Sequence, residues 1–460
     1  MTQTLLPFRI SRSELENFFS CPYSGYLSSL TPGPQRGSPI GLTPAGIQRR
    51  ERPSSLVIGG AIHKGWEMLL RRAASAEAAE DQAVEHALQH VREQALAHDH
   101  SGQSLSDFEL REALAMVEGL VRISARQIMP ILANLYEVVD VEPELSAPLA
   151  HGYSGEFAGA AGPVRLDIPS IEFAGRPDAV LRRREDGQVG SLSLKTSKYI
   201  EVPGELSKTG RKIVDQQAID MQSLSESWLL RGAGYDPSFI QFVTLRKGDV
   251  RQHETKEMER AGVPGFPYYN LPLLTGWKKE DGLGQAQYAW AWDFYKEEDG
   301  FRKKSTLSWT AWKRFWVFDE PGLSIREWLG MLERDEVFPP QHQSINGRSA
   351  LDNLFQVSLP IFRTDRQVEL WRVQSTAQAR RIADAWSLIK EEDPDSDDGL
   401  LHILEQFPRN TRSCVFPSRC QFFEHCHEGT PTRDPGMPVD MLFYQPRQEN
   451  HPRPEDDSKS

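Results

Sequence analysis

The stretch IEFAGRPDAVLRRREDGQVGSLSLKTSK (171–198) decides the fold class that the sequence predicts. Two of its segments alternate or run apolar, and the turn residues EDGQ lie between them, so we expect neighbouring strands. A strand-like segment, VVDVEPELSAPL (138–149), precedes the stretch. A helical pattern (213–231) and the strand-like FIQFVTLRKG (239–248) follow it. With a helical segment before them, the order helix, three strands, helix, strand predicts an α/β core.

Composition and patterning divide the remaining chain around this core. We expect one domain over residues 1–430 and a Pro-rich, polar, disordered tail over 431–460. The helical patterns before the core lie at 57–72, 79–97 and 107–136. In chain order, the parts of the domain are a helical region (about 57–136), the core (about 137–248), a Trp- and charge-rich insertion (about 249–345), and a C-terminal part with a strand, a helix and three cysteines (about 355–430).

The charge of the chain bears on its partners and its location. The formal net charge is −12, and the segment EEDPDSDD (391–398) carries six acidic residues without a base. A DNA-binding surface would therefore have to be local. The sequence has no apolar run of about 18 residues and no signal-peptide pattern at its start, so we expect no membrane association and a cytoplasmic protein.

The four cysteines stand near the two ends of the predicted domain. Cys21 lies in SELENFFSCPYSGYL (13–27), while Cys414, Cys420 and Cys426 lie in NTRSCVFPSRCQFFEHC (410–426). Four thiolates suit a tetrahedral zinc ion or a [4Fe–4S] cluster equally well by number. Structural zinc sites usually use two short cysteine-containing turns, called zinc knuckles, and the sequence has neither. This favours an iron–sulfur cluster over a zinc ion. Four unconnected buried cysteines are the third alternative, and they leave the even spacing of the triplet unexplained.

Three residues of the predicted core suit metal-dependent phosphodiester hydrolysis, which needs carboxylate ligands for a hard cation and a nearby positive charge. Asp178 in GRPDAVL comes late in one predicted strand, and Lys195 in LSLKTSK lies in the next. His63 lies four residues after Gly59 in the helical segment IGGAIHKGWEML (58–69). Each residue alone is as well explained by a structural role, so the prediction depends on their occurrence in this order.

These blocks resemble the iron–sulfur branch of the PD-(D/E)XK nucleases, which includes AddB-type and RecB-like nucleases and related phage and CRISPR-adaptation exonucleases. The residues that fit the N-terminal cysteine block are Ser13, Leu15, Phe18, Cys21 and Pro22, and those that fit the C-terminal block are Phe407, Pro408, Asn410 and the cysteine triplet. The core segments resemble the family's G-x-x-x-H, G-x-x-D and (D/E)-x-K-T blocks at His63, Asp178 and Lys195.

The resemblance implies a restriction-endonuclease-like core, with a mixed central sheet flanked by helices and a cluster joining the two ends. It implies that His63 and Asp178 bind Mg²⁺ or Mn²⁺ and that Lys195 positions the attacking water. It further implies that Cys21, Cys414, Cys420 and Cys426 hold a structural [4Fe–4S] cluster.

The chain departs from this family two residues before Lys195. Ser193 stands where the (D/E)-x-K block is acidic, and a serine hydroxyl is a poor metal ligand. On the following helix, Gln222 matches the first residue of the family's Gln-x-x-x-Tyr block, and Glu226 replaces the tyrosine. Residues four apart share a helix face, so both border the face that packs on the sheet. We hypothesise that Glu226 is a relocated metal ligand, with a degenerate site as the alternative.

A basic loop follows the predicted strand of Lys195. Its cations, which could hold DNA phosphates or form an ordinary solvated loop, are Lys198, Lys208, Arg211 and Lys212. Arg246 and Lys247, which end the next strand, are placed similarly.

The sequence therefore predicts a metal-dependent DNA exonuclease that acts on single-stranded or duplex ends in DNA repair, recombination or phage- and CRISPR-type DNA processing. No helicase motif stands out, so a helicase or recombination partner would act in trans. One alternative is a catalytically degenerate DNA-end-binding subunit, which Ser193 supports. Another is a zinc-stapled protein unrelated to nucleic acid.

Overall fold

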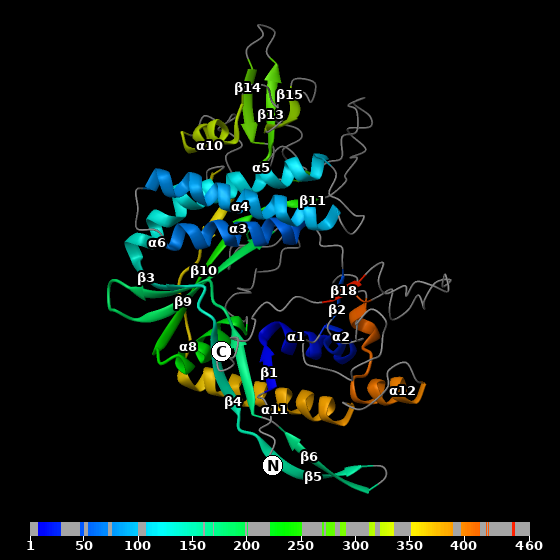
Figure 1. Ribbon diagram of the computed structural model, residues 1–460. Helices are drawn as coiled ribbons and strands as arrows, with labels where there is room; N and C mark the ends of the chain where they lie inside the picture. Colours follow the sequence, from blue (N-terminus) through cyan, green and yellow to red (C-terminus); the bar gives the residue numbers. More distant parts are fainter. Residues whose placement is uncertain are drawn as a thin grey trace, which may run out of the picture.

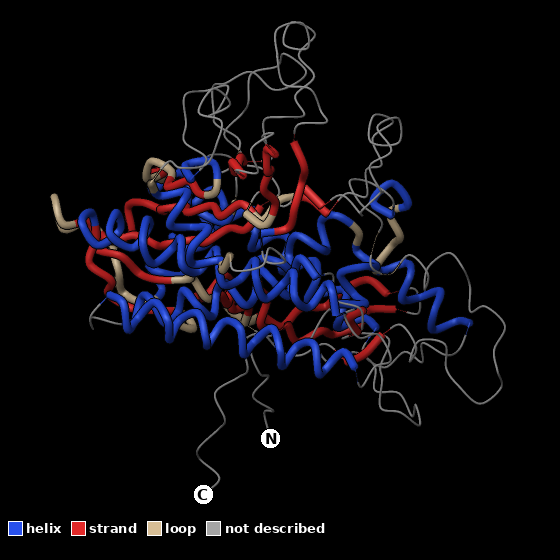
Figure 2. Tube along the Cα trace, turned by 90° about the horizontal axis from the view of Figure 1, so that it is seen from above, coloured by secondary structure: helices blue, strands red, loops and turns tan. Residues whose placement is uncertain are grey.

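The computed structural model describes residues 8–28, 47–49, 54–71, 76–99, 107–159, 162–168, 170–197, 200, 221–250, 269–270, 273–280, 286–290, 312–317, 323–334, 351–389, 397–414, 420, 422 and 444–446. In this part of the chain the fold is α/β, as the sequence predicted, with helices around a mixed sheet (Figure 1). Helices also flank the strands when the molecule is seen from above (Figure 2).

The central sheet has six strands in the order β16-β10-β9-β8-β3, and β17 also pairs with β10. Its strands are β3 (Tyr136–Val141), β8 (Ala179–Arg183), β9 (Val189–Ser197), β10 (Pro237–Arg246), β16 (Phe355–Val357) and β17 (Ile361–Phe362). Within this sheet β9 and β10 run parallel, and the other paired strands run antiparallel. Parallel neighbours need a crossover, which includes helix α8 (Gln222–Gly232).

Alternation along β9 assigns its side chains to two faces of the sheet. Leu192 and Leu194 are buried on the face that helix α3 (Ser54–Arg71) covers, within the same apolar cluster as α3 residues. Ser193 and Lys195 point to the opposite face, where both contact α8. The same alternation that builds the core therefore turns the polar residues of β9 toward one helix.

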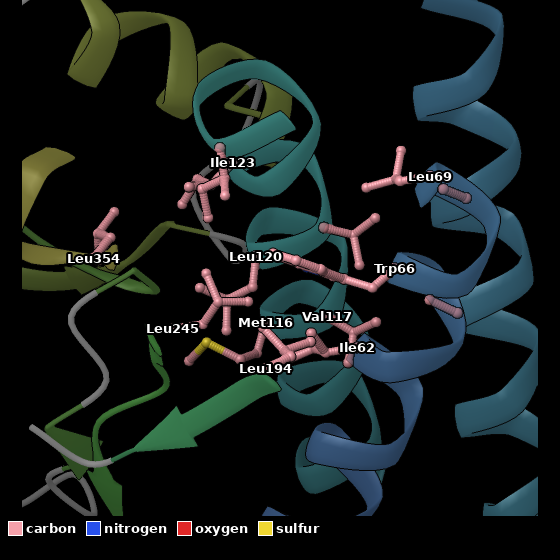
Figure 3. Close-up of a cluster of buried hydrophobic side chains, with 14 of the residues drawn as sticks. Ile62, Trp66, Leu69, Met116, Val117, Leu120, Ile123, Leu194, Leu245 and Leu354 are labelled. Carbon is pink, nitrogen blue, oxygen red and sulfur yellow. The ribbon is translucent and has the colours of Figure 1, made fainter. Parts of the chain in front are cut away.

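The first hydrophobic core joins α3 to α4 (Ala76–Asp99), α5 (Asp107–Ile123) and one face of the sheet. In Figure 3 the side chains of Ile62 and Trp66 from α3 lie beside those of α5, and Leu194 reaches the cluster from β9. A Cβ atom at Gly65 would lie 2.8 Å from Val121, so α3 and α5 approach closely at this glycine. This packing fixes α3, and with it His63, against the sheet.

The predicted insertion contributes side chains to this first core. Leu273 and Trp328, both fully buried, belong to the cluster, and the Trp328 indole N–H donates to the Leu273 carbonyl oxygen over 3.0 Å. Helix α10 (Ile325–Glu333) begins at Ser324 with a capping box and packs on α5. The apolar face of α10 therefore joins the insertion to the first core.

A second core brings both ends of the described chain together. It lies between a three-stranded sheet of order β1-β7-β4 and helices from the N- and C-terminal parts. Its elements are β1 (Phe8–Ser11), α1 (Arg12–Ser20), α2 (Pro22–Ser28), β4 (Leu145–Ala150), β7 (Ile171–Gly175), α11 (Asp365–Ile389) and α12 (Asp397–Gln406). The ring centroids of Tyr26, Trp386 and Phe407 lie 5.1 to 5.4 Å apart, so aromatic packing closes this core.

Smaller elements complete the described chain. They are β2 (Ile47–Arg49), a π-helical turn (Ser124–Ile128), α6 (Met129–Leu135), β5 (Tyr153–Gly159), β6 (Gly162–Ile168), β11 (Asp249–Val250), β12 (Tyr269–Asn270), β13 (Thr275–Glu280), β14 (Ala286–Trp290), β15 (Trp312–Trp316), two short 3₁₀ turns (Leu351–Asn353 and Thr411–Cys414) and β18 (Tyr444–Pro446). Strands β5 and β6 form a hairpin, and β14-β13-β15 form a small antiparallel sheet.

Several predicted segments are divided in the structure. The first predicted strand is split into β3 and β4 near Glu142, whose φ of 48° lies in the left-handed region. The second is split into β7 and β8 around Pro177, which lacks a backbone donor. Asp178 consequently precedes β8 instead of lying late in a strand. The predicted helix over 107–136 is interrupted by the π-helical turn, because Pro130 cannot complete the helical hydrogen-bond ladder.

The prediction of a disordered tail is wrong for residues 444–446. They form β18, which pairs antiparallel with β2, so ladder hydrogen bonds order this short piece. The other residues of the predicted tail lie outside the described part. Among the described helices, none is both long and apolar enough to cross a bilayer.

Glu112 on α5 gives a stability prediction. The residue is 6% exposed, and within the described part of the chain its Oε1 atom has no hydrogen-bond partner. Burial together with the nearby Glu109 raises its pKa to about 7. Because this carboxyl holds its proton longer in the folded state, its ionisation costs stability as pH rises from about 4.5 to about 7. We expect Glu112→Gln to raise the unfolding free energy by roughly 1–3 kcal/mol at pH 8 and much less at pH 5.

Denaturant unfolding at the two pH values measures this difference. Glu85→Gln on the exposed face of α4 is the control, since its side chain is 67% exposed. An equal effect of Glu112→Gln at both pH values would contradict the prediction.

Candidate active site

His63 and Asp178 meet at one end of the central sheet. The Nδ1 atom of His63, on α3, lies 2.8 Å from Oδ1 of Asp178, which directly precedes β8. The backbone N–H of Leu194 on β9 donates to Oδ2 of Asp178 over 2.6 Å. The two side chains are 33% and 20% exposed, so the pair is held by the fold and is still reachable from solvent.

The electrostatics of this pair favour the charged forms of both groups. Burial alone would raise the pKa of Asp178, but His63, the Leu194 N–H and Lys195 outweigh it, and the pKa is lowered. Burial would lower the pKa of His63, but Asp178 outweighs it and raises the pKa, with Glu142 adding to the effect. Without metal, the pair is therefore a charge-assisted contact, which a divalent cation would replace after the imidazole loses its proton.

Gln222 at the start of α8 connects the remaining polar groups. Its Oε1 atom accepts hydrogen bonds from the Lys195 ammonium and, over 2.9 Å, from Nη1 of Arg12. Its Nε2 atom donates to Oγ of Ser193 over 2.8 Å and to Oε1 of Glu226. Cations face the amide oxygen while acceptors face the amide nitrogen, so the partners fix the orientation of the amide.

Glu226 is buried one helical turn after Gln222. It is 6% exposed, and its Oε2 atom finds no hydrogen-bond partner among the described residues. Burial raises its pKa to about 7 against the opposing effects of Ser191, Gln222 and Lys195, and the charge of Asp178 adds to the rise. A buried carboxyl of this kind is costly to ionise without a cation nearby.

The structure thus gathers five of the predicted residues, but it does not preassemble a metal cage. His63 and Asp178 meet directly, whereas Glu226 faces the Gln222 amide. Among the described residues, no three His, Cys, Asp or Glu side chains stand close enough to hold one metal ion. The donor chemistry nevertheless suits Mg²⁺ or Mn²⁺, since His63 and Asp178 supply an imidazole and a carboxylate and Glu226 supplies a second carboxylate.

Sequence reasoning missed Glu142 as a neighbour of this site. Its backbone N–H donates to the carbonyl oxygen of Asp178 over 3.1 Å, and its carboxylate lies 3.6 Å from Arg176 and 4.0 Å from Lys64. Its left-handed backbone follows β3 and precedes a proline. The Glu-Pro pair that ends an apolar run is the available sequence signal, and it indicates a chain break without indicating a function.

The three cysteines within the described residues, Cys21, Cys414 and Cys420, lie in one region and form no disulfide bond with one another. Cys21 follows α1, and its Sγ atom accepts from the Asn410 backbone N–H over 3.4 Å. Sγ of Cys420 accepts from Phe422 N–H over 3.4 Å. Burial, then the proximity of Cys420 and Cys21, raises the pKa of Cys414. The three thiols are therefore neighbours, although among the described residues they do not stand close enough to hold one metal ion.

Five predicted site residues lie outside the described part: Cys426 and the loop cations Lys198, Lys208, Arg211 and Lys212. Arg246 corrects the expectation of a second phosphate-binding pair, because it is only 4% exposed. A guanidinium buried at the end of β10 is poorly placed to contact DNA.

No protein-family model matches this sequence, and no curated protein matches it either. The functional interpretation therefore depends on the residues of the site and on their geometry.

Proposed function

We propose that this protein is a metal-dependent DNA exonuclease of PD-(D/E)XK type, which hydrolyses phosphodiester bonds at DNA ends. The observation that carries the proposal is the placement of Asp178 just before β8 and of Lys195 on the neighbouring strand β9, with His63 bonded to Asp178 and Glu226 bonded to Gln222. Two carboxylates, an imidazole and an ammonium group in one region of the sheet suit hydrolysis of a phosphate diester.

The roles of the residues follow from their surroundings. Asp178, His63 and Glu226 would hold Mg²⁺ or Mn²⁺, which activates water and neutralises phosphate charge when bound. Lys195 would orient the attacking water and stabilise negative charge on the phosphate, while Gln222 fixes its ammonium group. Glu226 supplies the carboxylate that Ser193 lacks, and the hydrogen bond from Gln222 connects both.

The order of the central sheet supports the same proposal. Strands β3, β8 and β9 form an antiparallel run, and β10 joins it parallel to β9 after α8. The PD-(D/E)XK resemblance predicts a mixed sheet with helices on both faces. It also predicts active-site residues at the second and third strands, here β8 and β9, and on the helices α3 and α8.

The proposal includes a structural [4Fe–4S] cluster held by Cys21, Cys414, Cys420 and Cys426. We expect anaerobically purified protein to be brown and to absorb near ~400 nm, whereas a zinc protein would be colourless. Cys21→Ala should remove the colour and lower the melting temperature by roughly 5 °C or more, because the cluster ties two chain ends together. Ser13→Ala on the exposed side of α1 is the matched control.

Spectroscopy and metal analysis of the same preparation decide between the alternatives. Colourless protein with one bound zinc would support the zinc-stapled alternative. Protein with neither metal, whose stability is unchanged in Cys21→Ala, would mean that the cysteines are unconnected.

The biological setting belongs to the same proposal. An iron–sulfur nuclease would work in the reducing cytoplasm, in DNA repair, recombination or phage- and CRISPR-type DNA processing. A helicase or recombination partner would unwind or present the DNA in trans. With a net charge of −12, contact with DNA would be confined to the surroundings of the active site.

Cleavage of end-labelled DNA tests the proposed function directly. We expect linear single-stranded or duplex DNA to be shortened from its ends with Mn²⁺, and covalently closed circles to remain intact. Chelation by EDTA should stop the reaction, as should Lys195→Ala, while Arg92→Ala, which removes an exposed cation of α4, should leave it unchanged.

Ser193 favours the second candidate function, a DNA-end-binding subunit without catalysis. This candidate predicts tight binding of linear DNA, no product with either metal, and equal binding by Lys195→Ala and wild type within error. Failure both to bind and to cleave linear DNA would contradict both candidates.

A further inference from the structure

Helix α1 connects the cysteine region with the active site. Arg12 is its first residue, and Cys21 directly follows its last residue, Ser20. Nine residues at about 1.5 Å per residue place these two ends roughly 13 Å apart. One short helix therefore contacts two sites with different chemistry.

The C-terminal end of α1 is fixed by the segment that carries Cys414. The Ser20 carbonyl oxygen accepts from Nδ2 of Asn410 and from Oγ of Ser413, each over 2.8 Å. The Asn410 backbone N–H reaches Sγ of Cys21. These bonds satisfy carbonyl and thiol groups that would otherwise be unpaired at the helix end, so α1 is bound to the cysteine segment.

The N-terminal end of α1 is equally fixed. Ser11 and Glu14 form a reciprocal capping box, and the preceding strand β1 pairs in parallel with β7. The guanidinium of Arg12 then reaches Oε1 of Gln222 over 2.9 Å and lies 3.8 Å from Glu16. The Arg12 side chain is 32% exposed, so it lines the accessible side of the Gln222 network.

We propose that Arg12 is a positioning residue of the active site, and that the cysteine region acts on catalysis through α1 and Arg12. This inference rests on the proposed nuclease function. Arg12 and Lys195 both donate to the Gln222 oxygen, which keeps the amide nitrogen turned toward Glu226. When Arg12 is removed, the amide can rotate, and both Lys195 and Glu226 lose a fixed partner.

Kinetics of four variants test the inference in the full-length protein with linear DNA and Mn²⁺, with the cluster loaded in the variants that keep Cys21. We expect Arg12→Ala to lower kcat roughly tenfold or more with little change in KM, and Arg12→Lys to restore part of the loss. Cys21→Ser should lower kcat. The double variant Arg12→Ala/Cys21→Ser should lose less kcat than the product of the two single-variant losses. Arg92→Ala is the matched control for the loss of an arginine.

Hydrogen–deuterium exchange on the same proteins tests the link without turnover. Arg12→Ala and Cys21→Ser should each speed exchange in the first turn of α8, and Arg92→Ala should not. Wild type that fails to cleave DNA would contradict the nuclease proposal, and the exchange result would then decide the link by itself.

Three results would overturn the inference while the nuclease proposal stands. The first is an Arg12→Ala protein with wild-type kcat. The second is an Arg12→Ala protein in which only KM rises and DNA binding depends less on salt, which would make Arg12 a DNA contact. The third is unchanged exchange at α8 in both variants.

Discussion

Asp178→Asn is expected to abolish metal-dependent DNA cleavage, with a rate at least ~10³-fold below that of wild type. The asparagine keeps the shape of the side chain and can still accept the Leu194 N–H. It loses the negative charge that holds the pKa of His63 up and that would bind the cation. The change therefore removes electrostatic function while preserving most of the local packing. Single-turnover cleavage of end-labelled DNA with saturating Mn²⁺ measures the effect.

Asp186→Asn is the matched control for this substitution. Asp186 lies in the turn between β8 and β9 and pairs with Arg183 at the surface, so cleavage should be unchanged. Melting curves of both variants establish that they are folded. If folded Asp178→Asn cleaves DNA at a wild-type rate, the site proposed at the start of β8 is wrong.

The second large effect is expected for Glu226→Gln, which should lower cleavage roughly 100-fold or more if Glu226 is the relocated ligand. The same variant should be more stable than wild type in metal-free protein at pH 8. Burial raises the pKa of Glu226 to about 7, so ionisation destabilises the fold as pH rises from about 4.5 through about 7. A neutral glutamine removes this cost. At pH 5 the two proteins should differ little.

If Glu226→Gln is both more stable and less active than wild type, the Glu226 carboxylate serves the function of the protein and not its stability. Wild-type cleavage should also rise with pH toward about 7, as Glu226 loses its proton and becomes able to bind metal. Glu172→Gln on β7, in the three-stranded sheet β1-β7-β4, is the matched control and should change neither the cleavage rate nor the stability. Full activity of Glu226→Gln would exclude the relocation and direct attention to Ser193→Asp, which restores the acidic residue of the family pattern.

Local patterns predicted the parts of the site that depend on one strand or one helix. Alternation along β9 aligned Ser193 with Lys195, and four-residue spacing aligned Gln222 with Glu226. The order of elements gave the α/β core because each of these segments carries its own apolar period. Both kinds of signal extend over a few residues.

These local patterns could not predict the contacts between segments that are distant in the sequence. Arg12 meets Gln222 across a sequence separation of 210 residues, and nothing in either segment specifies the other. Glu142 is placed by a backbone turn after β3, and turns at such positions are set by tertiary packing. The apolar residues of the predicted insertion likewise became core because α10 covers α5.

The second core has a consequence for synthesis on the ribosome. Its aromatic contacts join Tyr26 to Trp386 and Phe407, and the bond between Asn410 and Cys21 spans 389 residues. The contacts that Tyr26 and Cys21 make in this core must wait until Trp386, Phe407 and Asn410 have been synthesised. We therefore expect the C-terminal end of α1 to become fixed late in translation, so that the proposed active site gains the support of the cysteine segment only then.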